Sequence, residues 1–243
     1  MLSAFTALVF GACAPAASDL EVGFDPEEGS FSGDLPDSLI VDPAQIQPFA
    51  SFGPFTNVEV PEQEDDPQPV ADSITDFTSV QGMNNWWYGY IEPKGTNTFT
   101  QAEVYVANGA DPGWYALPDG QTWTFMDADT MHPNGETTTG GREPLEQWAA
   151  RRWVSTVEGN LRITGELSKY YVDGTSSGVA GYVYVDGVMV WAWYIEGWDN
   201  TGVTFDKTLP VAVGSTVDFM LDPWESDDRS DRSVFTSQMF TAE

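Results

Sequence analysis

The stretch GYVYVDGVMVWAWYI, residues 181–195, decides the fold. Two runs of β-branched and aromatic residues flank Asp186-Gly187. An Asp-Gly pair readily adopts the positive φ angles of a two-residue type I′ turn, and residue runs of this composition favour strands. The stretch therefore predicts a tight β-hairpin.

The turn also predicts the register of the hairpin, because successive side chains of a strand alternate between its two faces. Val185 should oppose Val188, and Val183 should oppose Val190, so that one face carries valine. We expect this face to lie in a core. The other face should be half exposed and carry four aromatic side chains: Tyr182, Tyr184, Trp191 and Trp193.

The same kind of pattern extends over residues 75–243, where short runs of Val, Ile, Tyr, Trp and Thr alternate with Gly, Asp, Asn and Pro. Such spacing is typical of a sandwich or barrel. In STVDFML (215–221), alternation sends Val217, Phe219 and Leu221 inward and Asp218 outward. We expect an all-β domain over 75–243, a two-sheet antiparallel β-sandwich. The expected strands are 85–91, 101–107, 121–126, 151–157, 160–168, 178–185, 188–195, 202–209, 215–221 and 233–240.

One segment of this region has helix-forming composition. Residues 143–150 read EPLEQWAA, which is rich in good helix formers but barely two turns long. We expect a single short helix there.

Residues 1–17, MLSAFTALVFGACAPAA, place an apolar stretch before small residues, which is typical of an export signal. The usual basic residues are missing, and we expect the true start of the chain to lie upstream. The segment Phe10-Gly11-Ala12-Cys13 resembles the bacterial lipobox, which implies a lipid anchor on Cys13. The alternative is ordinary secretory cleavage after Ala16 or Ala17, which would remove that cysteine. Either way, we expect an extracytoplasmic protein, secreted or on the outer surface of a bacterial envelope.

Residues 18–74 are rich in Pro, Asp, Glu and Ser, with no sustained period of 2 or 3.6. An acidic segment of this kind cannot bury enough apolar area to fold alone, so we expect a disordered linker. The exception is SLIVDPAQIQPFASFGPF, residues 38–55, which is apolar enough to dock on the domain or on a neighbouring subunit.

The charge of the chain excludes several classes of partner. The 38 acidic and 9 basic residues give a net charge of −29. Without a basic cluster to neutralise phosphates, we expect no binding to nucleic acid or to an anionic bilayer surface. One Cys and one His (His132) cannot build a disulfide framework or a Cys/His zinc site.

Five blocks follow one another along the domain: QGMNNWWYGY (81–90), RRWVSTVEGNLRITGEL (151–167), GVAGYVYVDGVMVW (178–191), DNTGVTFDKTLPVAVGSTVDFMLDP (199–223) and SDRSVFT (230–236). In this order they resemble a bacterial extracytoplasmic β-sandwich family that is carbohydrate-binding-module-like, with a jelly-roll-like fold. The resemblance covers most of residues 76–243 and implies sugar binding. It brings no catalytic residues with it, and fold alone does not fix activity.

Sugars stack their flat C–H faces on aromatic rings, so exposed aromatic residues are the candidate binding site. The hairpin face with Tyr182, Tyr184, Trp191 and Trp193 is one candidate. The run Trp86-Trp87-Tyr88 is the other, and alternation sends Trp87 to the side opposite its two neighbours. The alternative for any single Trp is that it is simply buried.

The loop DPWESDDRSD, residues 222–231, concentrates carboxylates of the kind that Ca²⁺ prefers. Its spacing does not match an EF-hand. The alternative is a solvated acidic loop partly neutralised by Arg229 and Arg232, and we expect no other cofactor. The candidate ligands are Asp222, Asp227, Asp228 and Asp231.

These observations favour a non-catalytic protein that binds a polysaccharide or cell-surface glycan through exposed aromatic residues and touches the membrane only through a lipid anchor. One alternative is a structural or assembly protein of the cell surface, self-associating through the aromatic face and residues 38–55. A second is a glycan-active enzyme, although nothing selects a carboxylate pair. His132 has no partner for a catalytic triad in sequence.

Overall fold

The computed structural model describes residues 23–25, 30–32, 68–95, 97–138 and 140–242. The chain divides into two compact units, Met1–Gln63 and Glu64–Glu243. In the first unit, β1 (Gly23–Asp25) pairs antiparallel with β2 (Ser30–Ser32). The export signal with Cys13, most of the expected linker and residues 38–55 lie outside the described residues. In the described part of the chain, no helix is long and apolar enough to cross a membrane.

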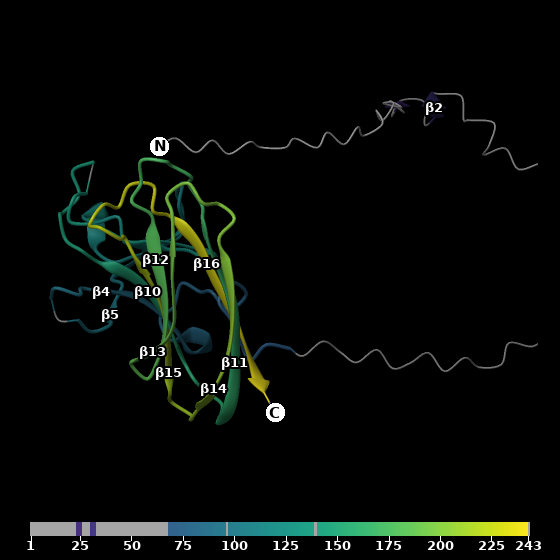
Figure 1. The fold of residues 1–243 in the computed structure, drawn as a ribbon, viewed down its shortest axis with the longest axis vertical. Helices are drawn as coiled ribbons and strands as arrows, with labels where there is room; N and C mark the ends of the chain where they lie inside the picture. The colour runs from purple at the N-terminus through teal and green to yellow at the C-terminus, as the bar shows by residue number, and fades with distance from the viewer. Residues whose placement is uncertain (1–22, 26–29, 33–67, 96, 139, 243) are drawn as a thin grey trace, which may run out of the picture. The chain divides into compact units, whose positions relative to one another are not determined.

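The second unit consists of two antiparallel sheets (Figure 1). In spatial order, the six-stranded sheet contains β13 (Val188–Ile195), β12 (Val179–Val185), β15 (Thr216–Asp222), β10 (Trp148–Val154), β4 (Trp86–Ile91) and β5 (Thr100–Gln101). The eight-stranded sheet contains β14 (Val203–Val211), β11 (Gly159–Lys169), β16 (Ser233–Ala242), β9 (Thr130–His132), β8 (Phe125–Met126), β7 (Gly113–Tyr115) and β6 (Val104–Val106), and β3 (Ala71–Asp72) also pairs with β16. Single 3₁₀ turns occupy Met83–Asn85 and Pro118–Gly120.

The two sheets bury one continuous core between them. Phe219 of β15 and Phe235 of β16 meet edge to face across the interface, with ring centroids 6.0 Å apart. Val217 and Leu221 flank Phe219 and are fully buried, as their alternation predicted. The expected all-β fold of two antiparallel sheets is confirmed.

A buried arginine also joins the sheets. Arg151 of β10 is 1% exposed, and its guanidinium donates to the carbonyl oxygens of Asp127 (2.7 Å), Thr130 (3.0 Å) and Phe235 (3.2 Å). These carbonyls belong to β9, β16 and the loop before β9, all on the side of the eight-stranded sheet. Nε of Arg151 has no hydrogen-bond partner among the described residues, so these three bonds are what offsets the cost of burying the charge, and they tie the two sheets together.

The hairpin turn forms as predicted, but the predicted strand pairing holds only as far as Tyr184 and Met189. Asp186 and Gly187 adopt φ angles of 50° and 78°. Tyr184 then pairs with Met189 as expected, whereas Val183 pairs with Trp191 because Val190 is the extra residue of a bulge. The prediction that Val183 opposes Val190 is therefore wrong. Trp191 points inward, where its ring lies 4.6 Å from that of Phe205.

The helix expected at 143–150 is also absent from the structure, which describes that whole range. Trp148–Val154 forms a central strand that pairs with β4 on one side and β15 on the other. Its helix-forming alanines are overridden by these two ladders, since intrinsic propensity is a weak preference. The domain also begins before Thr75, because Ala71 and Asp72 pair with β16.

Replacing Arg151 tests the central role of this residue. The Arg151→Met substitution fills the space but removes one donor from each of three carbonyl oxygens, of which that of Thr130 still accepts from the backbone of Asp127 at 3.1 Å. We expect the free energy of unfolding to fall by about 3 kcal/mol or more. Urea titration followed by tryptophan fluorescence measures this loss. The control is Arg162→Met, which removes an exposed ion pair to Asp206 and should cost less than about 1 kcal/mol. Equal stability of the two variants would contradict the assignment.

Candidate functional site

The outer face of the six-stranded sheet carries a second apolar cluster, separate from the core. Alternation along β10 turns Trp148, Ala150 and Arg152 away from the core. Ala150 lies in register with Gly89 of β4 and Met220 of β15. These side chains are small or buried, so the middle of the face forms a low floor.

Aromatic rings rise on the two sides of this floor. The Trp148 ring stacks on Tyr182 of β12, with centroids 5.3 Å apart and planes 19° from parallel. Tyr184 follows on the same face, 6.3 Å from Tyr182. Phe99, just before β5, packs against the same cluster. The arrangement gives a half-buried aromatic surface rather than a closed core.

Charged groups hold the rings in place. Arg152 donates from Nε and Nη2 to the two carboxylate oxygens of Asp218, at 2.6 and 2.9 Å, and its guanidinium lies 4.4 Å from the Phe99 ring centre. Tyr182 donates its hydroxyl to Asp222, at 3.1 Å. Burial and the neighbouring Asp222 carboxylate raise the pKa of Tyr182, so the phenol stays a hydrogen-bond donor.

A cavity of about 440 Å³ lies over this face, and we call it the sheet cleft. A volume of this size is in the range of small-ligand sites. The cleft combines aromatic surface with an amide, a hydroxyl and an ion pair. Its lining residues are Ile91, Asn97, Thr98, Phe99, Trp148, Arg152, Tyr184, Gly187, Asp218 and Met220.

The structure brings three of the predicted aromatic residues to this face. Tyr182 and Tyr184 lie there as expected. Trp87 lies on the same face because it pairs with Arg152 on the neighbouring strand. Arg152 in turn pairs with Asp218, and Asp218 with Tyr184, so all four side chains point to one side of the sheet. Each of the two candidate aromatic groups thus places at least one ring on this face, although Trp87 and Tyr182 are not among the residues that line the sheet cleft.

Four other predicted aromatic residues do not join it. Trp86 and Tyr88 are 0% and 1% exposed, because alternation turns both into the core. Trp191 also faces inward, since the bulge at Val190 reverses the parity of β13. Trp193 shares the side of Trp191 and, although 53% exposed, does not line the sheet cleft. The expectation of four hairpin aromatic residues on one face is therefore wrong.

Sequence reasoning missed Trp148, Arg152 and Phe99 as parts of the site. The alternation in WAARRWV (148–154) contains the signal, since it separates Trp148 and Arg152 from Arg151 and Trp153. The alternation was missed because residues 143–150 were expected to form a helix. Phe99 comes from an irregular segment, where no periodicity applies.

The carboxylates of the 222–231 loop turn to different partners. Asp222 accepts from Tyr182, Asp228 from the backbone of Gly135, and Asp227 from the backbone of Arg229. Asp231 forms a fully buried ion pair with Lys169, at 3.0 Å. Across the described residues, no three His, Cys, Asp or Glu side chains are grouped to hold a metal ion. The four candidate calcium ligands are therefore not gathered around one point, and Asp231 is held in the interior by Lys169.

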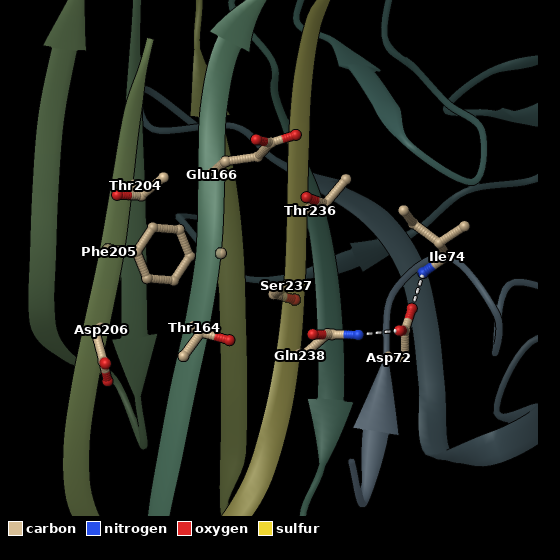
Figure 2. Close-up of a pocket in the computed structure, with 11 residues that line it drawn as sticks. Asp72, Ile74, Thr164, Glu166, Thr204, Phe205, Asp206, Thr236, Ser237 and Gln238 are labelled. Carbon is tan, nitrogen blue, oxygen red and sulfur yellow. Dashed lines mark hydrogen bonds between the residues drawn. The ribbon is translucent and has the colours of Figure 1, made fainter. Parts of the chain in front are cut away.

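A larger cavity, of about 530 Å³, lies on the outer face of the eight-stranded sheet. Figure 2 shows that its side chains stand on neighbouring strands and are mostly short and polar, with Gln238 donating to Asp72. Phe205 is its one aromatic lining residue and is 6% exposed. This cavity offers little aromatic surface, so the sheet cleft fits the chemistry of a sugar better.

Comparison with known proteins gives no family. No family model matches the chain, and no curated protein does. Several solved structures are similar in fold at low identity. The chain is 13% identical to a family 51 carbohydrate-binding module from Clostridium perfringens solved with methyl-galactose (49% of this chain and 86% of that one, TM-score 0.32). It is 12% identical to a family 6 module of a Zobellia galactanivorans laminarinase (63% and 98%, TM-score 0.28).

A third similar structure contains the catalytic domain and two family 51 modules of Clostridium perfringens ZmpB, at 14% identity and a TM-score of 0.32. The match covers 46% of this chain and only 11% of that larger protein. All three similarities are distant, so the architecture and the site rest on the geometry described above.

The ion pair under the cleft is open to a double-mutant test. In Arg152→Leu, Asp218, which is 3% exposed, keeps a buried carboxylate without its partner. We expect a loss of about 2 kcal/mol in the free energy of unfolding. Adding Asp218→Leu should restore more than half of it, because both charges are then gone. Denaturant unfolding of the wild type, of Arg152→Leu, of Asp218→Leu and of the double variant measures the coupling, and additive losses would contradict a specific pair.

Proposed function

We propose that this protein is a non-catalytic binder of a polysaccharide or cell-surface glycan, and that the sheet cleft is its binding site. The observation that supports this most is the stack of Trp148 on Tyr182 beside Tyr184, over a floor of small side chains. Sugar rings need such flat apolar surfaces with hydrogen-bonding groups at the rim. Asn97 and Thr98 supply hydrogen-bonding groups among the lining residues, and the Arg152–Asp218 pair lies beneath them.

The carboxylates near the cleft support binding rather than hydrolysis. A glycosidase needs one carboxylic acid and one carboxylate free to act on the bond between two sugars. Asp218 is held by both donor nitrogens of Arg152, and Asp222 accepts from Tyr182 and from the backbone of Trp224. Both groups are committed to holding side chains in place.

The proposal includes export. The signal over residues 1–17 and the lipobox-like segment ending at Cys13 would place the domain outside the cytoplasm, held off the membrane by the acidic linker. Detergent partitioning of the wild type and of Cys13→Ser measures the anchor. The anchor part of the proposal fails if both proteins partition alike.

The binding site is tested by affinity electrophoresis of the whole protein through gels that contain single neutral polysaccharides. We expect retardation by at least one of them. In Trp148→Ala/Tyr184→Ala the dissociation constant should rise about tenfold or more, since truncating central aromatic contacts removes most of the binding energy.

The matched control is Trp198→Ala, which removes an indole that is 64% exposed and does not line the cleft. It should leave retardation unchanged, and melting temperatures confirm that each variant is folded. Unchanged retardation of the double variant, or no retardation of the wild type by any polysaccharide, would overturn the proposal.

Self-association is a second candidate function, and the edge of the six-stranded sheet favours it. β13 is an edge strand that exposes Val188 (65%), Met189 (53%) and Trp193 (53%). Unpaired strand edges with exposed apolar side chains pair readily with another chain. Sedimentation at increasing protein concentration distinguishes the two functions: a binder stays monomeric, whereas an assembly protein forms larger species that Met189→Lys or deletion of residues 38–55 disrupts.

A further inference from the structure

A separate cavity of about 290 Å³ lies beside β7, β8 and β9. Its central feature is a stacked pair: the guanidinium carbon of Arg142 lies 4.2 Å from the ring centre of Trp123. The cavity shares no lining residue with the sheet cleft. It is lined by Asp111, Tyr115, Thr122, Trp123, Phe125, His132, Arg142, Tyr171 and Arg232.

Arg142 differs from most basic side chains of this acidic protein. It has no ion pair with any residue that the structure describes. In contrast, six other basic residues each contact a carboxylate: Lys94, Arg152, Arg162, Lys169, Arg229 and Arg232. In a chain with 38 acids and 9 bases, a half-buried guanidinium without such a contact is available to an external anion.

Hydrogen bonds to the backbone hold the segment that carries Arg142 next to the segment that carries Trp123. Asn134 is fully buried; its side-chain oxygen accepts from the backbone of Trp123 (2.8 Å), and its amide donates to the carbonyl of Glu143 (2.9 Å). Glu143 N donates to the Gln121 carbonyl at 2.7 Å. The segments that carry Trp123 and Arg142 are thereby tied together.

Gly120 makes room for the guanidinium. It has a φ of 62°, and a Cβ placed there would collide with Nη1 of Arg142. A residue with a side chain would therefore be strained and would displace the arginine. The site is preorganised by a glycine as well as by hydrogen bonds.

Among the basic side chains that line this cavity, Arg142 is the positive charge available to a bound anion. Arg232 is neutralised by Asp111 (2.6 Å) and Asp127 (2.5 Å). Burial lowers the pKa of His132 to about 4, so the imidazole is neutral at pH 7. Two buried polar atoms of the cavity wall, Oγ1 of Thr122 and Nε of Arg142, have no hydrogen-bond partner among the described residues.

We propose that this cavity binds a sugar residue that carries a carboxylate, with the carboxylate on Arg142 and the ring against the aromatic wall. A guanidinium matches a carboxylate with two parallel hydrogen bonds. The rings of Tyr115, Trp123 and Tyr171 supply apolar surface for the C–H face of a pyranose, and Asp111 supplies an acceptor for hydroxyls. The cavity volume is at the lower end for ligand sites, which suits a single sugar unit.

Calorimetric titration of the whole protein with D-glucuronate at pH 7 tests the proposal. We expect saturable binding of glucuronate, and much weaker binding of methyl glucoside, which lacks the carboxylate, and of acetate, which lacks the ring. Arg142→Gln should weaken glucuronate binding about tenfold or more, because the charged hydrogen bonds are lost. The matched control Lys207→Gln removes an exposed positive charge on β14 that does not line the cavity, and it should have no effect.

A second variant guards against loss of folding. Gly120→Ala should also weaken binding by displacing the guanidinium, while the melting temperature shows how much native protein remains. Glucuronate binding that is absent, unaffected by Arg142→Gln, or matched by acetate would each overturn the proposal. Because the sheet cleft is tested with neutral polysaccharides and with Trp148 and Tyr184 variants, failure at one site is distinguishable from failure at the other.

Discussion

The docking of the two sheets depends on one buried guanidinium. Arg151 leaves the six-stranded sheet through the core and donates to three carbonyl oxygens of the opposite side. Apolar packing tolerates small shifts between two sheets, whereas a charge with three directed hydrogen bonds does not. The pairing of Phe219 with Phe235 and the placement of the short strands β8 and β9 are consistent with this fixed geometry.

The next residue of β10 has its side chain on the opposite face of the sheet. Arg152 points outward and holds Asp218 under the sheet cleft, so adjacent arginines of β10 serve the core and the site in turn. This proximity means that the cleft is built on a strand in the middle of the sheet, paired on both sides. Sites on such elements hold their side chains more firmly than sites on loops.

Local signals predicted the elements of the fold better than the site. The Asp186-Gly187 turn, the strand parity of Val217, Phe219 and Leu221, and the all-β class follow from composition and alternation within short windows. The cleft needed long-range register: Trp148 of β10 and Tyr184 of β12 line it together because both strands pair with β15, a neighbour that local patterns do not reveal. The role of Arg151 was hidden for the same reason, since its acceptors lie 21, 24 and 84 residues away.

The bulge at Val190 decides which side chains of β13 face the core. One extra residue in β13 sends Trp191 between the sheets and leaves Tyr182 and Tyr184 to form the outer face with Trp148. The bulge absorbs the extra residue: deleting Val190 would keep Trp191 opposite Val183, whereas a regular strand that retained Val190 would turn Trp191 outward. An edge strand can therefore change its length by one residue and keep its inward-facing side chains, because a bulge forms or disappears at that point.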